Sequence, residues 1–497
     1  MGSHLLALDQ GTSSSRAIVF TGAGAIRATA QTEFAQHYPH PGWVEHDPEE
    51  IWTTTLDVAR RALAEADLRP GDLAGIGITN QRETVVLWDR ATGTPLHRAV
   101  VWQDRRTAQR CERLRAAGLE ADVQQRTGLL LDPYFSATKL EWLLDEIPDA
   151  RARAERGELA FGTVDSWLLW KLTAGRVHVT DATNASRTLL YDLATGAWSD
   201  ELCEIFRIPR AVLPGIVDSS GVVAETSAEL LGAPVPVAGI AGDQQAALFG
   251  QACLAPGAAK STYGTGCFAM THTGHEALFS RNRLLTTVAS RLDGRDAFAL
   301  EGSIFVAGAA VKWLRDALGI IATAAESEAA ARRTGGDTGG VYLVPAFAGL
   351  GAPWWDAEAR GLVCGLTLDT GADQLVTATL KSVAYQTRDL LDAMTADGAR
   401  PEVLRVDGGM VVNDWLCQTL ADVLELPIER PRGTETTALG AACLAGLATG
   451  VHTDPSTLAA SWRCERRFEP ALDRDRLEAE LAGWRDAVAR TRGAGAS

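Results

Sequence analysis

The sequence predicts an α/β protein built from two related lobes. Its 497 residues, 46% of them hydrophobic and 22% charged, are enough for two or three domains with sizeable cores. Over the first 80 residues the expected order is strand, strand, strand, helix, strand, which is typical of a mixed sheet with an antiparallel hairpin at one side. A turn of glycine and threonine follows an apolar strand near the N-terminus and again near residue 264, and this recurrence indicates a second lobe of the same kind.

Local patterns predict the elements of the first lobe. Asp47 is followed by Pro48 and Glu50, as at a helix N-terminus capped by an aspartate. Apolar residues then recur at helical spacing, so we expect a helix from about Pro48 to Ala66. Strands are expected at residues 5–9, 16–20, 25–31 and 74–79. The first two form a hairpin around a small polar loop whose backbone is open to a ligand.

The second half of the chain repeats the alternation of strands and helices. The apolar run Val237–Ala241 predicts a strand, and we expect the second unit to begin near it, with the lobes at residues 1–245 and 246–497. Residues 437–449 are so rich in alanine and glycine that their helix must pack closely against another backbone. Residues 258–268 carry the second glycine-threonine loop behind an apolar strand. A further strand is expected at 403–406, and further helices at 376–394 and from Asn413. Ordered crossings between the lobes could act as a hinge.

Charge and cysteine content exclude several classes of protein. Lys and Arg total 47 against 63 Asp and Glu, a net charge of −16 that repels nucleic acid and anionic lipid. No apolar run approaches the roughly 20 residues that a membrane-spanning helix needs. The eight cysteines lack paired spacing and look like reduced core residues. We therefore expect a cytoplasmic protein with no nucleic-acid partner and no membrane span.

Three glycine-containing turns follow predicted strands, and together they indicate phosphate binding. They are Asp9–Thr12, Tyr263–Gly266 and Asp407–Gly409. Glycine lets the backbone approach a phosphate, whose oxygens then accept from N–H and hydroxyl groups. Each turn alone could be an ordinary hairpin turn. None is a Walker A loop or a GxGxxG fingerprint, which disfavours P-loop and Rossmann folds.

Asp9 and Asp243 each end an apolar strand. A carboxylate in such a place suits a hydrated Mg²⁺ or a proton accepted from a substrate hydroxyl. The alternative is an aspartate that caps the turn or helix after it. Residues Gly242–Gln245 gather an acid and two amides without an apolar partner, which favours a ligand site.

A second polar cluster, Asn80–Glu83, closes a strand expected to be buried. Its Arg-Glu pair could be a surface ion pair of little value, but at the end of an interior strand it is more typical of a grip on a polyhydroxylated ligand. Trp102, Tyr134 and Phe268 could supply the apolar wall for the ligand's carbon atoms, with core packing as the alternative for each.

Several of these segments resemble the glycerol kinases of the FGGY carbohydrate kinase superfamily. They are Leu8–Arg16, Gly77–Thr84, Val101–Thr107, Asp132–Ser136, Gly239–Gly250, Thr262–Phe268 and Asp407–Gly409. The resemblance extends from about Leu5 to Val451. Asn80–Glu83 together with Gly242–Gln245 distinguishes glycerol kinases from the sugar kinases of that superfamily.

The resemblance implies a fold, a reaction and partners. The fold would be two ribonuclease-H-like lobes of the actin type with a cleft between them. In the cleft, ATP would phosphorylate glycerol to sn-glycerol 3-phosphate with Mg²⁺ present, by in-line transfer with Asp243 as general base. A homodimer or homotetramer is expected from such relatives.

The resemblance also implies the binding residues. Those that would hold glycerol are Arg82, Glu83, Trp102, Tyr134, Asp243, Gln244 and Phe268. Those that would contact ATP are Thr12, Ser13, Ser14, Arg16, Thr265, Gly308, Lys312, Gly409 and Asn413. Asp9 and Asp243 would organise Mg²⁺ and its waters. Lys312 departs from the glycerol kinase pattern, in which glutamine is frequent.

Two alternatives to a glycerol kinase remain. An FGGY kinase for another polyol or for a ketose would share the fold and most of these residues. An actin-like or chaperone-like ATPase would use the same nucleotide cleft with a protein partner, but it has no need of the Arg82, Glu83, Asp243 and Gln244 constellation.

Overall fold

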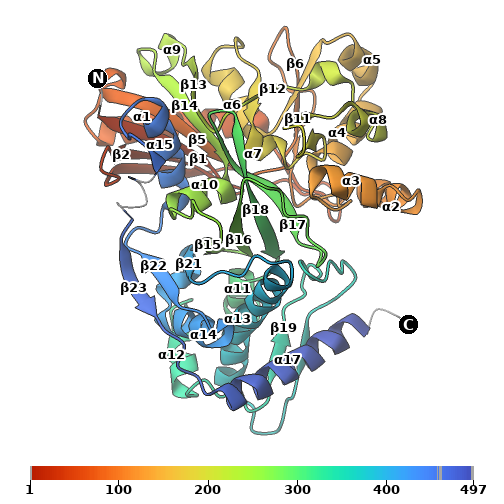
Figure 1. Cartoon of the computed structure of the whole chain (residues 1–497), viewed down its shortest axis with the longest axis vertical. Coiled ribbons are helices and arrows are strands. Elements are labelled where there is room, and N and C mark those ends of the chain that lie inside the picture. The colour runs from red at the N-terminus through yellow and green to blue at the C-terminus, as the bar shows by residue number, and fades with distance from the viewer. Residues whose placement is uncertain (1–2, 456, 458–461, 494–497) are drawn as a thin grey trace.

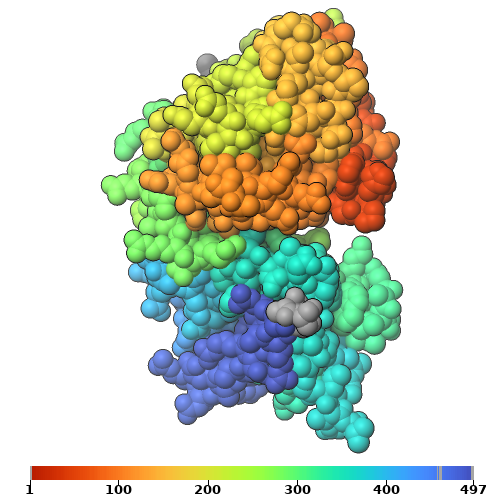
Figure 2. Space-filling view, turned by 90° about the vertical axis from the view of Figure 1, so that its right-hand side faces the viewer, coloured from red at the N-terminus to blue at the C-terminus, as the bar shows by residue number. Residues whose placement is uncertain are grey.

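The computed structural model describes residues 3–455, 457 and 462–493. Two lobes lie one above the other, the N-terminal half of the chain forming most of the upper lobe (Figure 1). The space-filling view shows a hollow between the red N-terminal residues of the upper lobe and the lower lobe (Figure 2). Each lobe is built around one large sheet.

The sheet of the N-terminal lobe has six strands in the order β13-β14-β5-β1-β2-β3. Their bounds are β1 His4–Gln10, β2 Ser14–Thr21, β3 Ile26–Glu33, β5 Leu73–Asn80, β13 Ser220–Glu225 and β14 Pro236–Gly242. β1 pairs antiparallel with β2, which confirms the predicted hairpin. β14 is an inner strand parallel to β5, so the prediction that the strand at Val237–Ala241 opens the second unit is wrong. An apolar run fits the interior of either sheet, and its pattern could not tell which.

The sheet of the C-terminal lobe has seven strands in the order β17-β18-β16-β15-β21-β22-β23. Their bounds are β15 Ala259–Tyr263, β16 Cys267–Gly274, β17 Leu285–Leu292, β18 Arg295–Ile304, β21 Leu404–Asp407, β22 Ile428–Pro431 and β23 Cys464–Phe468. β15 pairs antiparallel with β16 and parallel with β21, just as β1 pairs with β2 and β5. Beyond β5 the N-terminal sheet continues with β14, which is parallel to β5, and β13, which is antiparallel to β14. Beyond β21 the C-terminal sheet continues in the same way with β22 and then β23. The two lobes therefore share a topology, which confirms the predicted relationship.

Helices cover the sheets and fill the connections. In the order of the chain they are α1 Pro48–Glu65, α2 Ala108–Ala116, α3 Glu120–Thr127, α4 Ser136–Glu146, α5 Ala150–Glu155, α6 Val164–Leu172, α7 Ala182–Ala185, α8 Asp200–Ile205, α9 Ala228–Leu231, α10 Asp243–Gly250, α11 Gly308–Asp316, α12 Glu326–Arg333, α13 Ala372–Ala396, α14 Asp414–Leu424, α15 Thr436–Ala448 and α17 Arg474–Gly493. α1 has the predicted cap, since the Asp47 carboxylate accepts from the Glu49 N–H at 2.8 Å. It packs on β2 and β3.

Two helices cross between the lobes. α15 comes from the C-terminal half of the chain but packs on β1, β5 and β14 of the N-terminal sheet, where its blue ribbon lies among red ones (Figure 1). α10 follows β14, packs along α15 and reaches β15 of the other sheet. The predicted boundary between residues 245 and 246 falls within α10 and stays a prediction.

The crossing helices approach their neighbours at backbone contact. A Cβ atom at Gly440 of α15 would lie 1.8 Å from the Ala246 carbonyl oxygen of α10. One at Gly77 of β5 would lie 2.1 Å from the Ala441 carbonyl oxygen. Such distances leave room only for glycine, and they confirm the close packing predicted from the alanine-rich and glycine-rich sequence of α15.

Residues 81–219, inserted between β5 and β13, form a further layer with its own core. That core also takes in Leu285 and Val288 of β17 and Phe298 of β18. By hydrogen bonding the β17–β18 hairpin belongs to the C-terminal sheet, while these side chains belong to the insertion. Figure 1 shows the two strands rising from the lower lobe towards α7. The hairpin thus links the two lobes.

Within the described residues, no helix has both the length and the apolar character required to cross a bilayer. All eight cysteines are free thiols, and six of them are buried, as expected. Cys464, on the edge strand β23, is exposed, so it is not a core residue.

Asp389 on α13 carries a titratable group inside the C-terminal lobe. Its carboxylate accepts from Trp484 Nε1 of α17 at 2.9 Å, beside an open cavity of about 630 Å³ that none of the predicted site residues line. Burial, helped by the charge of Asp392 and opposed by the Trp484 bond, raises the pKa of Asp389 to about 7.

The raised pKa of Asp389 makes stability depend on pH. Because the folded state holds this proton more tightly than the unfolded chain, the carboxyl contributes stability below pH 4 that is lost as pH rises towards 7. Asp389→Asn keeps an acceptor for Trp484 and removes the titration, so we expect the free energy of unfolding of the variant to exceed that of the wild type by up to about 4 kcal/mol at pH 8 and by little at pH 4. Urea denaturation at both pH values measures this, and an equal difference at the two would contradict it.

Candidate active site

The site lies at the edge of the N-terminal sheet where its parallel strands end. Asp9 of β1 is opposite Thr79 of β5, and Gly242 of β14 is opposite Asn80. Asp9 and Asp243 therefore leave the same edge of the sheet, on strands separated only by β5, about 10 Å across. Ligands of open α/β sheets bind at this kind of edge.

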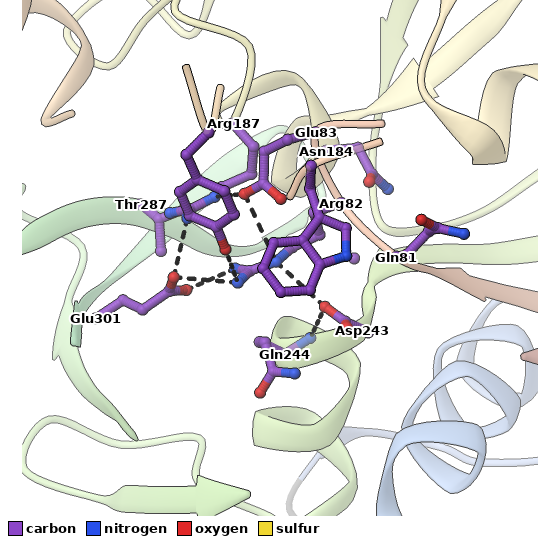
Figure 3. Close-up of polar contacts among 12 residues, drawn as sticks. Gln81, Arg82, Glu83, Asn184, Arg187, Asp243, Gln244, Thr287 and Glu301 are labelled. Atoms are coloured by element: carbon purple, nitrogen blue, oxygen red, sulfur yellow. Dashed lines mark hydrogen bonds and ion pairs between the residues drawn. The ribbon is translucent and has the colours of Figure 1, made fainter. Parts of the chain in front are cut away.

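Arg82 is the centre of a polar cluster next to this edge (Figure 3). Its Nε lies 3.2 Å from Asp243 Oδ1, and its Nη1 donates to Gln245 Oε1 at 3.2 Å. The side chain passes over Gly242, where a Cβ atom would lie 2.7 Å from Arg82 Cδ. Only glycine before Asp243 leaves space for the guanidinium to reach the carboxylate.

Three ion pairs in this cluster involve Glu301 or Arg187, residues that the sequence did not single out. Glu301 of β18 accepts from Arg82 Nη1 at 2.5 Å and Nη2 at 3.0 Å, and from Arg187 Nη2 at 2.9 Å. Arg187 Nε also donates to Glu83 Oε1 at 2.6 Å. Burial alone would raise the pKa of Glu301, but the guanidinium groups of Arg187 and Arg82 lower it to about 2. Burial raises the pKa of Glu83 in spite of the same two arginines.

Asp243 begins α10 and is the most accessible acid of the cluster, with its side chain 32% exposed. Its Oδ1 accepts from the Gln244 N–H at 2.7 Å, while Oδ2 has no hydrogen bond within the described part of the chain. Gln244 Oε1 accepts from the buried Lys260 Nζ at 2.5 Å. This bond orients the Gln244 amide and leaves its N–H groups free to donate to a ligand.

The three aromatic residues predicted as an apolar wall lie together. The ring of Trp102 is 5.7 Å from that of Tyr134 and 6.2 Å from that of Phe268, both edge-on. Trp102 comes from the N-terminal half of the chain and Phe268 from β16 of the C-terminal sheet, so the wall spans the cleft. Trp102 Nε1 donates to Thr12 Oγ1 at 2.9 Å, which joins the wall to the first glycine turn.

The first glycine turn holds the other predicted phosphate donors. Ser13 is exposed, whereas Ser14 is buried and its Oγ accepts from Gln31 Nε2 at 2.9 Å. Arg16 pairs with Glu435, at the start of α15. Thr12 and Ser13 are therefore the accessible hydroxyl groups of this turn, and Arg16 reaches a phosphate only by leaving or sharing Glu435.

The second glycine turn adjoins the start of α11. Thr265 is exposed, and its carbonyl accepts from the Ala309 N–H at 3.0 Å. The Gly308 N–H donates to the Gly264 carbonyl at 2.9 Å, and a Cβ atom at Gly308 would lie 2.6 Å from that oxygen. Lys312 is exposed one turn further along α11.

The third turn adjoins the second, because a Cβ atom at Gly408 would lie 2.5 Å from the Tyr263 carbonyl oxygen. Gly409 begins a short 3-10 turn, and a Cβ atom there would meet nothing within 4 Å. Asn413 is the N-cap of α14, its Oδ1 accepting from the Leu416 N–H at 2.9 Å. Its role as a helix cap is enough to explain an asparagine at this position, with no ligand needed. The cap uses only Oδ1, so the N–H groups of the side-chain amide remain able to donate to a ligand.

Sequence reasoning missed Glu301, Arg187 and Lys260. Glu301 and Lys260 each lie within otherwise apolar or small-residue stretches of a strand, a signal that could have identified them as buried charges. In the predicted cluster, Asn80 and Gln81 turn inwards, Asn80 Nδ2 donating to Asn184 Oδ1 at 3.0 Å and Gln81 Nε2 to Gln10 Oε1 at 3.0 Å. The side chains of Asn80 and Gln81 therefore bind other protein side chains at the edge of the sheet.

The carboxylates fit a hydrated Mg²⁺ better than a metal enclosed by protein ligands. Burial, opposed by Arg16 and helped by Asp243, raises the pKa of Asp9 to about 6, so a cation is needed beside it to keep it ionised at lower pH. No three His, Cys, Asp or Glu side chains within the described residues gather as a metal cage. Two carboxylates with waters and phosphate oxygens are a usual Mg²⁺ environment.

Two family models match the chain. The N-terminal domain of the FGGY family of carbohydrate kinases matches residues 4–250, and the C-terminal domain of that family matches residues 259–449. The chain belongs to the FGGY family of carbohydrate kinases. Its two-lobed α/β structure is the FGGY kinase fold, as predicted.

Individual FGGY kinases align along nearly the whole chain. It is 62% identical to a glycerol kinase of Alcanivorax borkumensis and 59% identical to glycerol kinase 1 of Pseudomonas aeruginosa, over 98% and 99% of both chains. It superposes on the crystal structure of Plasmodium falciparum glycerol kinase with ADP with a TM-score of 0.91, at 35% identity over 99% of both chains. These relatives agree with the resemblance seen in the sequence.

Proposed function

We propose that the protein transfers the γ-phosphoryl group of ATP to glycerol and forms sn-glycerol 3-phosphate, with the residues of the cluster around Arg82 as the acceptor site. The observation that carries the proposal is the identity of up to 62% with glycerol kinases over almost the full length of the chain. Xylulose kinases of solved structure share this fold at no more than 27% identity in the cases compared.

In this proposal the cluster holds glycerol and receives its proton. Arg82, Glu83 and Gln244 bind the hydroxyls, while the rings of Trp102, Tyr134 and Phe268 contact the carbon atoms. Asp243 accepts the proton of the attacking hydroxyl at the carboxylate oxygen that has no protein donor. The bond from that hydroxyl oxygen to the γ-phosphorus forms as the bond to the β,γ-bridging oxygen breaks, so that ADP leaves.

The three glycine turns would bind the nucleotide. Thr12 and Ser13 on one lobe and Thr265 on the other offer accessible donors to phosphate oxygens, with the segments that begin at Gly308 and Gly409 along the rest of ATP. Asp9 and Asp243 would hold Mg²⁺ through its waters, an ion that supplies positive charge against the phosphates. Closure of the lobes would exclude water, which otherwise competes as acceptor.

A comparison of acceptors tests the proposal. ATP turnover is measured for the purified protein with glycerol, dihydroxyacetone, erythritol, xylulose and no acceptor, and the product is identified by mass. We expect kcat/KM for glycerol to exceed that for the others by about 10²-fold or more. Preference for xylulose or erythritol would support a kinase for a ketose or another polyol. Equal ATP hydrolysis with and without acceptor would support an actin-like ATPase.

Glu83→Gln separates binding of the acceptor from binding of ATP. The neutral amide keeps the volume of the side chain but accepts more weakly from Arg187 and from a glycerol hydroxyl. We expect the KM for glycerol to rise about 10-fold or more while the KM for ATP changes less than about 3-fold. A large loss of ATP affinity with an unchanged KM for glycerol would remove Glu83 from the acceptor site.

A further inference from the structure

We infer that Glu301 is a positioning residue for the acceptor site: from the C-terminal sheet it holds Arg82 directly, and Glu83 through Arg187, in the orientation that both need to bind the acceptor beside Asp243. This inference rests on the proposed function, because it takes Arg82 and Glu83 as acceptor ligands. Glu301 itself needs no contact with substrate for this role.

The contacts of Arg82 leave it one orientation. Glu301 accepts from both terminal nitrogens, the forked arrangement that fixes the plane of a guanidinium (Figure 3). With that plane fixed, Nε is the nitrogen that faces Asp243, at 3.2 Å. The second N–H of Nη2 makes only a long 3.5 Å contact with Tyr134 Oη and is the one available to an acceptor hydroxyl.

A second path runs from Glu301 through Arg187 to Glu83. Arg187 donates through Nη2 to Glu301 and through Nε to Glu83, so its guanidinium spans the two carboxylates. Glu83 has a φ of 59°, a left-handed backbone conformation that a non-glycine residue keeps only when its surroundings hold it. The pair with Arg187 is one such restraint.

The four charges balance inside the protein. Arg82, Arg187, Glu83 and Glu301 have side chains that are at most 2% exposed, and two positive charges face two negative ones. Loss of the carboxylate of Glu301 would leave an uncompensated positive charge with little water nearby. Of the carboxylates in the cluster, the two arginines would keep only their present partners, Glu83 and the partly exposed Asp243. A shift of either arginine towards these carboxylates changes the acceptor site.

Because of Glu301, the proposed acceptor site depends on residues from both lobes. It lies on β18, which is hydrogen-bonded to β16 and β17 of the C-terminal sheet, whereas Arg82 follows β5 of the N-terminal sheet. The Arg82–Glu301 pair therefore crosses between the sheets, as the aromatic wall of Trp102 and Phe268 does. A change in the relative position of the two lobes would therefore alter how Arg82 and the aromatic wall contact the acceptor.

Glu301→Gln tests the inference, with Asp296→Asn as the matched control. Asp296 lies on the same strand, and its carboxylate is likewise held by an arginine, Arg291 Nε at 2.6 Å. For E301Q we expect the KM for glycerol to rise about 10- to 100-fold and kcat to fall about 10-fold, with the KM for ATP changed less than about 3-fold. For D296N we expect the kinetic constants of the wild type. Isothermal titration with glycerol alone should show the same loss of affinity in E301Q.

Two results would overturn the inference: a folded E301Q with the glycerol KM and kcat of the wild type, or the same change in KM in D296N. Glu301→Asp covers the case in which E301Q does not fold. It keeps the charge but is one methylene shorter, so it cannot hold both arginines at the present distances, and we expect a glycerol KM at least about 5-fold above that of the wild type. An unchanged KM in E301D would equally contradict the inference.

Failure of the proposed function gives a different result from failure of this inference. If the wild type prefers another acceptor, the glycerol proposal is wrong, and the variants are measured with the preferred acceptor instead. A selective rise in the KM for that acceptor in E301Q supports the positioning role, and an unchanged KM overturns it.

Discussion

Asp243→Asn is expected to lower kcat about 10²- to 10⁴-fold, the range for loss of a general base. Asparagine keeps the shape and the bond that Oδ1 accepts from the Gln244 N–H, but it cannot receive a proton from the acceptor hydroxyl. Because Arg82 also loses a charged partner at 3.2 Å, the KM for glycerol should change modestly in the same variant. Rapid-quench measurement of a single turnover separates the chemical step from product release.

The control for Asp243→Asn is binding of both substrates. Calorimetric titration with glycerol and with ATP should show a folded protein that still binds them. Turnover close to that of the wild type in a folded Asp243→Asn variant would exclude Asp243 as the base, whereas loss of ATP binding alone would assign the residue chiefly to the metal and nucleotide.

Gly440→Ala is expected to destabilise the protein by about 3 kcal/mol or more and to lower kcat as well. The added Cβ would lie 1.8 Å from the Ala246 carbonyl oxygen, so α10 or α15 must move. Asp243 begins α10 only three residues before Ala246, and a displacement of about 1 Å can cost 10²-fold in rate. A residue that no ligand contacts would thus affect catalysis through packing.

Gly433→Ala is the matched control for Gly440→Ala. It lies shortly before α15, and a Cβ atom there would meet nothing within 4 Å. Thermal melting and steady-state kinetics of the two variants should differ clearly. If Gly440→Ala melted at the temperature of the wild type and kept its kcat, the close contact between the crossing helices would not matter for the site.

Much of the fold and part of the candidate site follow from short-range patterns. The β1–β2 hairpin and the cap of α1 each depend on residues within a few positions of one another, and both were predicted. The three glycine turns and the aspartates at strand ends are equally local signals. The packing of α15 could also be inferred, because a helix so rich in alanine and glycine is packed densely only by close approach to other backbone.

The assignment of strands to lobes did not follow from sequence. β14 is an apolar strand like those of the second sheet, and only its pairing with β5 and β13 places it in the first. α15 likewise comes from the C-terminal half of the chain but covers the N-terminal sheet. The sequence pattern indicates which face of a strand or helix is buried, but it does not indicate which sheet that face packs against.

The sequence by itself determined that this chain forms two related α/β lobes with glycine turns and aspartates at strand ends, since each of those features depends on residues that are neighbours in the chain. Only the tertiary structure decided how Arg82 is held. Its partner Glu301 is 219 residues away on the other sheet, and Arg187 joins the cluster from a third segment. Buried charges must be paired where the chain brings them together, and that pairing is set by the packing of the lobes rather than by any local pattern.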